Sequence, residues 1–488
     1  MPKSKGFTGR VFNQAVSSEH AAEPHNSGSP TLSDPLTTDV AVVGGGPTGS
    51  ATAIALVDQG LDVCLIERTD FADPRVGEHL SPSAMSDLTA LNLQDVVTAG
   101  EHRKCAQVTF AWGSDEPDHT DYLVSPFGCG WNLRRPQFDK SLFEIALERG
   151  VKTYSDARVT ELQRINETWR ISFDPGRDDV LHAEAPILVD ATGRSAAMAR
   201  MLGEETVVFD KLIGLAGFLR HPDGKSAETD AILVEATNDG WWYAAPLLED
   251  RCVATFMTDS DILSDSCDSP EEFWLRHRQE SSLIEPLLGD FELESKIIVR
   301  PAQTQRLSKL AGPGWIAVGD AAMSFDPLSS SGLSKGLGAA RAVANAIGKV
   351  LDGVRGSSIR YEIDNLFEFE NYLIERAAIY RRETRWPNSV FWSRRQSSDP
   401  YEAPLKIDPN EKIVAVRSGN SRQHSSHPDD RLPSVDRVLM LDLAHRTCAA
   451  HELVALFKAN SRRSHTDREI IVAIQELIKD GQLKTVSA

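Results

Sequence analysis

The chain lacks long apolar runs, an excess of positive charge and paired cysteines. No hydrophobic stretch approaches the roughly 20 residues needed to span a bilayer. The first residues, MPKSKGFTGRVFNQAVSSEH, lack the apolar core of a secretion signal. Lysine and arginine number 52 against 71 aspartates and glutamates, a net charge of −19. Such a chain is expected to repel nucleic acids and anionic membranes. Without a membrane span or a secretion signal, it is expected to reside in the cytoplasm.

The six cysteines form no C-x-x-C pair and no cluster with histidines. Common zinc-binding patterns are therefore excluded, and free thiols in a reducing compartment are favoured. We expect no metal site. At 488 residues, of which 41% are hydrophobic, the chain is long enough for two or more globular domains.

A glycine-rich turn follows the short apolar strand expected over 40–43. In VVGGGPTGS, Gly44, Gly46 and Gly49 have the spacing G-x-G-x-x-G. Glycines at these positions let backbone N–H groups at a helix N-terminus approach a pyrophosphate. Glu67 ends the next strand 23 positions after Gly44, close to the separation of about 20 residues expected for a carboxylate that binds an adenosine ribose. The pattern predicts a bound dinucleotide.

Two later segments indicate that this dinucleotide is FAD. LVDATGR at 188–194 carries Asp190 and Gly193, and IAVGDAAM at 316–323 carries Gly319 and Asp320. An aspartate at the second turn can accept hydrogen bonds from ribityl hydroxyls. The helix N-terminus that follows favours negative charge on a flavin ring. These segments therefore predict FAD rather than NAD.

The three segments together resemble the fingerprints of p-hydroxybenzoate-hydroxylase-type flavoproteins, over roughly residues 38–397. The resemblance implies an α/β fold, with a Rossmann-like FAD-binding domain of the glutathione-reductase type and an inserted β-sheet substrate domain. It also places Arg135, in RPQFDKSL, beside the FAD. The predicted cofactor-binding residues are Gly44, Gly46, Pro47, Thr48, Gly49, Glu67, Arg68, Arg135, Asp190, Gly193, Gly319, Asp320, Pro327, Ser330, Gly332 and Leu333.

The composition divides the chain into expected parts. Residues 1–37 are polar and are expected to be a disordered tail. The FAD-binding domain is expected over 38–204 and 299–350, the substrate sheet over 205–298, and a helical segment over 351–397. Residues 398–432 have the composition of a linker. Residues 433–488 resemble a small winged-helix-like α+β module, in which 466–469 has the spacing of a helix-capping box.

Flavin-dependent halogenases form one branch that the chain resembles. They carry a W-x-W-x-I-P segment, an F-x-x-P-x-x-S-x-G segment and a lysine that intercepts hypohalous acid. Here GWWYAAP keeps only the first tryptophan and the proline, and Ser324 stands at the phenylalanine position. Lys104, eight residues before Trp112, has a spacing similar to that of the halogenase lysine. A halogenase acting on a small aromatic, with Lys104 as catalytic residue, is therefore one alternative; a solvated surface lysine is the other reading.

The chain more closely resembles flavoprotein monooxygenases that mature quinone cofactors in amino-acid oxidases and quinohemoprotein amine dehydrogenases. The resemblance is carried by GWWYAAPL at 240–247, GDAAMSFDPLSSSGLSKGL at 319–337 and YRRETRWPNSVFWSRR at 380–395. It implies hydroxylation of a tryptophan in a partner protein, as in cysteine tryptophylquinone biogenesis. The oxidant would be a flavin hydroperoxide formed from molecular oxygen, with electrons from NAD(P)H or from reduced flavin supplied by a reductase.

The candidate catalytic side chains are those expected near the flavin ring. Trp241, Trp242 and Tyr243 lie on an expected strand whose side chains alternate between the flavin and the opposite face, and they serve either the reaction or packing. His79, in VGEHLSP, and Asp326 either take a proton from a hydroxylated intermediate or hydrogen-bond backbone. Pro327 to Gly332 would form the backbone wall beside the ring.

The C-terminal module has three readings. It tethers a protein or peptide substrate, it binds DNA, or it only packs on the enzyme; we favour capture of a protein substrate. A flavin-bearing regulator without catalysis, which binds DNA or protein through this module, is a function of another class. Flavin retention without oxygen-consuming turnover would favour that regulator, and chloride-dependent products would favour a halogenase.

Overall fold

The computed structural model describes residues 35–122, 125–176, 180–354, 356–396, 412–415, 437–444, 448–461, 465, 470–471, 473–474, 477–478 and 483–486. Most of the expected tail over 1–37 and of the expected linker over 398–432 lies outside these residues. Two residues assigned to the tail instead form β1 (Leu36–Thr37), which pairs in parallel with β12. Within the described residues, no helix is both long and apolar enough to cross a membrane.

A six-stranded sheet in the order β22-β23-β13-β2-β3-β9 forms the core of the FAD-binding domain. Five of its strands are parallel and only β22 is antiparallel. The central strands are buried along their whole length, as expected for a sheet covered on both faces. The six strands are β22 (Ala311–Gly312), β23 (Trp315–Ala317), β13 (Ile187–Asp190), β2 (Val40–Val43), β3 (Val63–Ile66) and β9 (Lys152–Tyr154).

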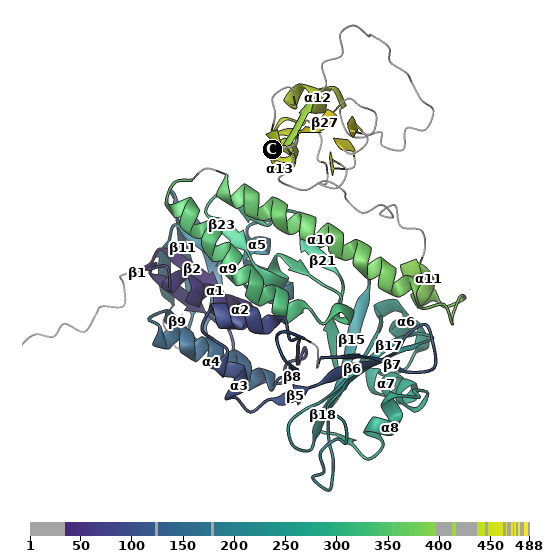
Figure 1. Ribbon diagram of the computed structural model, residues 1–488. Helices are drawn as coiled ribbons and strands as arrows, with labels where there is room; N and C mark the ends of the chain where they lie inside the picture. Colours follow the sequence, from purple (N-terminus) through teal and green to yellow (C-terminus); the bar gives the residue numbers. More distant parts are fainter. Residues whose placement is uncertain are drawn as a thin grey trace, which may run out of the picture. The chain divides into compact units, whose positions relative to one another are not determined.

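Helices cover one face of this sheet and a second, smaller sheet covers the other (Figure 1). The helical face buries Val40 and Val42 against the helices α1 (Pro47–Val57), α2 (Ala84–Ala90), α3 (Asp95–Thr98), α4 (Arg135–Glu148) and α9 (Gly332–Leu351). The other face buries Ala41 and Val43 with parts of β10 (Arg158–Ile165), β11 (Thr168–Asp174), β12 (Leu181–Ala185), α5 (Ala197–Met201) and α10 (Ser357–Arg381).

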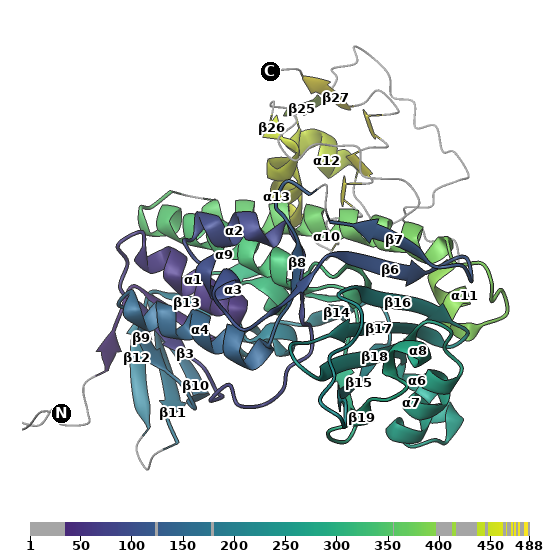
Figure 2. The ribbon, with the colours of Figure 1, turned by 60° about the horizontal axis from the view of Figure 1, so that its bottom comes forward.

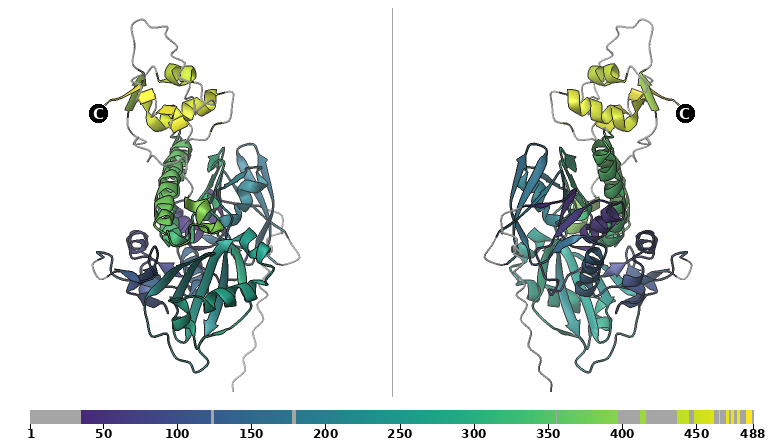
Figure 3. Two further views of the ribbon diagram at one scale, coloured as in Figure 1. Left: turned by 90° about the vertical axis from the view of Figure 1, so that its right-hand side faces the viewer. Right: turned by 90° about the vertical axis from the view of Figure 1, so that its left-hand side faces the viewer.

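A larger antiparallel-rich sheet forms the substrate domain, and its strands lie side by side in Figure 2. The strand order is β19 (Glu292–Leu293), β15 (Leu212–Arg220), β18 (Arg251–Asp259), β17 (Gly240–Pro246), β16 (Ile232–Thr237), β6 (Gln107–Ala111) and β7 (Asp118–Asp121), with β20 (Ile298–Pro301) beside β15. The twist of this sheet is visible from both sides in Figure 3.

The expected domain boundaries differ from this sheet at two places. Residues 107–121 were assigned to the FAD-binding domain, but β6 pairs in parallel with β16 and brings β7 with it. Residues 299–301 belong to β20, which pairs with β15. These pairings join segments that are distant in the sequence, so no local pattern announces them.

Aromatic side chains pack on both faces of the substrate sheet. Three short helices, α6 (Ser260–Ser266), α7 (Pro270–Gln279) and α8 (Ile284–Leu288), lie on the face that carries Trp242. The C-terminal end of α10 and α11 (Val390–Gln396) cover part of the face that carries Trp241. The strand β17 therefore alternates as a half-buried strand should, with Trp241 and Tyr243 sharing one face.

Two three-stranded sheets lie beside the large ones. One consists of β4 (His79–Leu80), β8 (Gly130–Asn132) and β5 (Arg103–Cys105). The other consists of β14 (Thr206–Val208), β21 (Gln305–Leu307) and β24 (Met323–Ser324). The first holds His79, and the second leads from the substrate sheet to Asp326.

The C-terminal module contains a three-stranded sheet of β26 (Cys448–Ala449), β25 (Lys412–Ala415) and β27 (Leu483–Val486), with α12 (Arg437–Leu443) and α13 (Ala450–Asn460). Ile413, Met440 and Phe457 share its buried core. The strand β25 lies inside the expected linker, so this linker is shorter than its composition suggested. The capping box expected at 466–469 lies outside the described residues, and the winged-helix type stays a prediction.

Candidate functional site

A cavity of about 790 Å³ extends from the carboxyl ends of β2 and β3 to the substrate sheet. Gly44 and Glu67 line it at the first end, and Tyr243 and Met257 line it at the second. The carboxyl edge of a parallel sheet is the usual place for a dinucleotide in α/β folds. The cavity therefore joins the expected cofactor site to the sheet expected to bind substrate.

The glycine turn leaves no room for side chains next to the first strand. Gly44 has φ +107°, and a Cβ atom there would lie 2.3 Å from the carbonyl oxygen of Ala191. A Cβ on Gly49 would lie 1.8 Å from the carbonyl oxygen of Gly44. Gly46, by contrast, has nothing within 4 Å of such an atom, and α1 begins after it without a side-chain cap. The free N–H groups of α1 therefore face open space that suits a pyrophosphate.

Glu67 is held at the end of β3 with its carboxylate in the cavity wall. Its Oε2 accepts a hydrogen bond from Gly45 N at 2.7 Å. Its Oε1 accepts from Thr69 N at 3.0 Å and from the Thr69 hydroxyl at 2.6 Å. Thr69 uses both lone pairs of Oε1, whereas Oε2 retains one lone pair that can accept from a ribose hydroxyl.

Arg135 begins α4 and fixes the neighbouring segment. Its Nη1 donates to the carbonyl oxygens of Val76 and Gly77, both at 2.9 Å, and its other nitrogens bind Asp139 at 3.0 and 3.1 Å. Burial opposes the charge of Arg135, but the Asp139 carboxylate outweighs it and raises the pKa of the guanidinium. Arg135 thus stays charged and positions the 76–79 backbone along the cavity.

Most predicted cofactor residues line the cavity. They are Gly44, Gly46, Pro47, Thr48, Glu67, Arg68, Arg135, Gly193, Asp320, Pro327, Ser330, Gly332 and Leu333. Gly49, Asp190 and Gly319 are not part of the cavity lining. The carboxylate of Asp190 accepts hydrogen bonds from Thr192 N and Ala199 N, and so fixes the turn before α5.

Some of the predicted catalytic residues line the cavity and the others do not. His79, Tyr243 and Asp326 line the cavity. Trp241 does not, because its ring is buried and its Nε1 donates to the Tyr380 hydroxyl at 3.0 Å. Trp242 packs against Trp274 on the opposite face of the sheet.

Lys104 also lies outside the cavity lining. Its side chain is exposed on β5, and its Nζ lies 5.7 Å from the ring centroid of Trp131. A cation over an aromatic face is stabilised without any catalytic role. Although its spacing to Trp112 resembles that of the halogenase lysine, the Lys104 amine lies at the surface.

Asp326 is the centre of a buried network that sequence reasoning did not assemble. Its Oδ2 accepts from the Tyr380 hydroxyl at 2.8 Å and from Arg376 Nε at 3.2 Å. Its backbone N donates to the Tyr372 hydroxyl at 2.5 Å. Tyr372, Arg376 and Tyr380 are four residues apart and therefore share one face of α10. The four-residue spacing in the sequence indicates a shared helix face, but it does not indicate that this face contacts Asp326.

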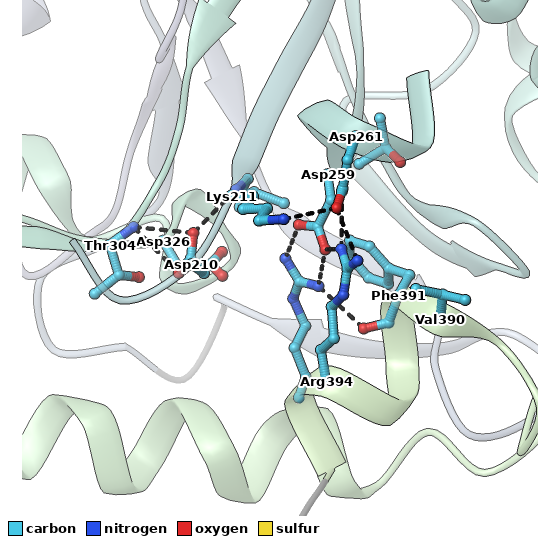
Figure 4. A network of polar contacts seen from close by, with 12 residues as sticks. Asp210, Lys211, Asp259, Asp261, Thr304, Asp326, Val390, Phe391 and Arg394 are labelled. Carbon is cyan, nitrogen blue, oxygen red and sulfur yellow. Dashed lines mark hydrogen bonds and ion pairs between the residues drawn. The ribbon is translucent and has the colours of Figure 1, made fainter. Parts of the chain in front are cut away.

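The helix α10 also contacts the segments that connect the FAD-binding domain with the substrate sheet. Arg376 Nη2 donates to Asp210 Oδ2 at 2.7 Å, and both oxygens of Asp210 accept from Thr304 N. Figure 4 shows Asp210, Thr304 and Asp326 grouped together. Further along, Arg394 binds Asp259 and Asp261, each at 2.8 Å (Figure 4). The helix α11 is therefore fixed by ion pairs to the end of the substrate sheet, and we call α11 with these ion pairs the clamp.

Burial moves the titration of two neighbouring groups at the substrate end. It raises the pKa of the Glu78 carboxyl to about 7 and lowers the pKa of the His79 imidazole to about 4. In both cases the low-dielectric surroundings disfavour the charged form. His79 Nε2 is 3.1 Å from the Tyr122 hydroxyl. Glu78 was not among the predicted site residues, although it stands in the VGEHLSP segment.

These two shifts act oppositely on stability. Folded Glu78 keeps its proton up to about pH 7 but loses it near 4.5 when unfolded, so its contribution falls as pH rises from 4.5 to 7. Unfolded His79 gains a proton below pH 6.5 but the folded form only near 4, so its contribution falls as pH drops from 6.5 to 4. The slopes cancel between pH 4.5 and 6.5.

Glu78→Gln is expected to unmask the His79 slope. Relative to wild type, the FAD-free variant should lose about 3 kcal/mol of unfolding free energy between pH 6.5 and 4.5, since one pKa unit corresponds to about 1.4 kcal/mol. Urea unfolding across this pH range measures it. The exposed Glu161→Gln is the control and should run parallel to wild type. Parallel curves for Glu78→Gln as well would contradict the assignment.

Comparison with known proteins identifies the family of the chain. A model of the FAD binding domain family matches residues 37–363. The chain belongs to this family. An FAD-dependent oxidoreductase, LodB, of Marinomonas mediterranea is 32% identical over 365 residues, which cover 74% of this chain and 97% of LodB. The chain is therefore an FAD-dependent oxidoreductase, and the residues at the glycine turn, at Glu67 and at Asp320 fit its FAD.

Halogenases are also among the relatives of this family member. The tryptophan 2-halogenase of Chondromyces crocatus is 25% identical over 376 residues, 74% of this chain and 71% of that enzyme. The solved structure of the myxobacterial chondrochloren halogenase CndH superposes with a TM-score of 0.70 at 25% identity, covering 75% of this chain and 87% of CndH. The expected α/β fold with a Rossmann-like FAD-binding domain is thereby confirmed.

Proposed function

We propose that the protein is an FAD-dependent monooxygenase that hydroxylates a tryptophan side chain of a partner protein during quinone-cofactor biogenesis, such as that of cysteine tryptophylquinone. The proposal rests on one continuous cavity that extends from the expected FAD site to the substrate sheet. Lys104 lies outside the lining of this cavity. The GWWYAAPL, GDAAMSFDPLSSSGLSKGL and YRRETRWPNSVFWSRR segments support the same function. Their residues lie on the substrate sheet, the cavity wall and the clamp.

Bound FAD supplies the activation of molecular oxygen. The chain must hold the ring against the flavin and keep water away. Gly214, Ala216 and Met257 give the substrate end an apolar floor, and Phe325 adds an apolar wall. The turn at 327–330 is fixed by Asp326, whose Oδ1 accepts from Leu328 N at 3.0 Å. These residues orient and shield a ring, which is what oxygen transfer to an aromatic carbon requires.

We propose that electrons come from NAD(P)H or from reduced flavin supplied by a separate reductase. The partner would be captured by the C-terminal module. LodB is matched over 97% of its length by 74% of this chain, so part of this chain has no counterpart in that relative. An added module suits a protein substrate, since tethering raises the local concentration of the target.

A flavin-dependent halogenase acting on a small aromatic is the second candidate, favoured by the halogenase relatives. It requires an amine that reaches the cavity, whereas Lys104 is exposed on β5. A flavin-bearing regulator remains the third candidate and predicts flavin retention without oxygen-consuming turnover.

One incubation separates the three candidates. The purified protein, a flavin reductase, NADH, heavy-isotope oxygen and bromide are combined with extract of the native host, and proteins and metabolites are read by mass spectrometry. Heavy oxygen on a tryptophan of one protein, unaffected by Lys104→Ala, is the expected result. Bromine on a small aromatic, abolished by Lys104→Ala, would establish the halogenase instead. Bound FAD with neither product would favour the regulator.

A further inference from the structure

Three buried polar atoms at the substrate end have no hydrogen-bond partner among the described residues. They are Glu78 Oε1, His79 Nδ1 and the Tyr243 hydroxyl, and all three residues line the cavity. Glu78 is only 2% exposed. Buried polar atoms in folded proteins are nearly always paired, because leaving one unpaired costs its full desolvation. These atoms therefore mark a place where a ligand supplies the missing partner.

Glu78 and Tyr243 come from different walls and are both held in place. The Glu78 backbone is fixed because its carbonyl accepts from Leu133 N at 2.8 Å, and its Oε2 accepts from Gly77 N at 3.0 Å. Tyr243 is fixed by its place in β17, between β16 and β18. After burial, the nearby Glu78 carboxylate is the next cause that raises the pKa of Tyr243. Both residues line the same cavity, and we call Glu78 and Tyr243 the polar corner of its substrate end.

The floor next to this corner consists of glycine, alanine, threonine and methionine residues of two paired strands. Thr255 of β18 pairs with Tyr243 on one side and with Ala216 on the other. Gly214 and Met257 form the adjacent pair. A Cβ on Gly214 would lie 3.0 Å from Thr255 Cγ2 and 3.1 Å from Met257 Sδ, so these two side chains border the space above Gly214. An apolar floor with one polar corner suits a flat ring that carries a single polar group.

We propose that Glu78 and Tyr243 bind the N–H group of an indole ring that lies on the floor formed by Gly214 and Ala216. The inference rests on the proposed function for its substrate class. Above its pKa of about 7 the Glu78 carboxylate is ionised and only accepts hydrogen bonds, so it then recognises a donor, and the ring N–H is the single donor that an indole offers. His79 is held by Tyr122 through its other nitrogen and borders the corner without being needed for this contact.

Ligand binding to the oxidised FAD-loaded enzyme tests the corner without turnover. The probes are N-acetyl-L-tryptophanamide and its 1-methylindole counterpart, which lacks the N–H. Each is titrated at pH 8, where Glu78 is mostly ionised, while the flavin absorbance is followed, because a ring beside the flavin perturbs its spectrum. The methylated probe is expected to bind wild type about tenfold more weakly, the typical loss for one hydrogen bond to a charged acceptor.

Glu78→Gln and Tyr243→Phe are expected to shrink this tenfold ratio toward one, by weakening binding of the unmethylated probe. Matched controls are Glu161→Gln, on exposed β10, and Tyr154→Phe, on β9; both should keep the ratio. The FAD content of each variant is measured alongside. Loss of FAD from Glu78→Gln would assign Glu78 to the flavin site and overturn the inference.

Two further results would overturn it: an unchanged ratio in both corner variants, or no spectral change with either probe. The outcome is separable from that of the proposed function. An enzyme that discriminates between the probes but never transfers oxygen would keep the indole site and remove the monooxygenase. Oxygen transfer to tryptophan without discrimination between the probes would keep the monooxygenase and remove the indole site.

Discussion

Gly49→Ala is expected to abolish functional FAD binding and to destabilise the FAD-binding domain. The new Cβ would lie 1.8 Å from the carbonyl oxygen of Gly44 and 3.0 Å from the Cβ of Ala191, so α1 must move away from the strands. Overpacking of this kind costs about 3 kcal/mol. Displacing the α1 N–H groups from the pyrophosphate removes about two charge-assisted hydrogen bonds, which corresponds to at least a hundredfold weaker FAD binding.

Gly46→Ala is the matched control for the stability loss alone, because Gly46 itself lines the cofactor end of the cavity. Gly46 has φ −67° and nothing within 4 Å of an added Cβ, so the FAD-free protein should keep its stability within about 0.5 kcal/mol. Urea unfolding of the FAD-free proteins and FAD titration by fluorescence give the two quantities. A Gly49→Ala protein with wild-type FAD affinity would show that the turn does not form the cofactor site.

Asp259→Asn is expected to cost about 3–5 kcal/mol of unfolding free energy, because it leaves a buried guanidinium without its counter-charge. Asp259 and Arg395 have side chains only 2% and 4% exposed, and Arg395 donates to both carboxylate oxygens at 2.6 and 3.1 Å. The lost ion pair anchors α11, so the clamp on the substrate sheet should open with it. Urea unfolding at neutral pH measures the loss.

Arg394→Met tests the same clamp from its exposed side. The Arg394 side chain is 38% exposed, and its pairs with Asp259 and Asp261 are screened by water. Its removal should cost less than about 1 kcal/mol. Equal losses for Asp259→Asn and Arg394→Met would mean that burial does not strengthen the inner pair.

The cofactor end of the cavity follows from short-range patterns, whereas the substrate end does not. Gly44, Gly49 and Glu67 are constrained by two strands, one turn and one helix that follow each other in the sequence, so their spacing predicts their geometry. The alternation along β17 likewise predicts that Trp241 and Tyr243 share a face. It does not predict that Tyr380 covers Trp241, because that contact depends on where a distant helix docks.

The residues missed by sequence reasoning are those whose meaning depends on tertiary contacts. Glu78 stands next to His79, which was predicted, but its burial depends on tertiary packing that no local pattern shows. Lys104 shows the opposite case: its spacing to Trp112 resembles a catalytic pattern, and the pairing of β5 with β8 places it at the surface. Arg376 has no local motif and joins Asp326 with Asp210.

The network around Asp326 has a consequence for the order in which the protein is made. The glycine turn and Glu67 leave the ribosome early, when the chain has only begun to fold. The wall at 327–330 is held by Tyr372, Arg376 and Tyr380, which are synthesised later. During translation, the nascent chain therefore completes its FAD pocket only after α10 has emerged, and stable cofactor capture belongs to the final stage of synthesis.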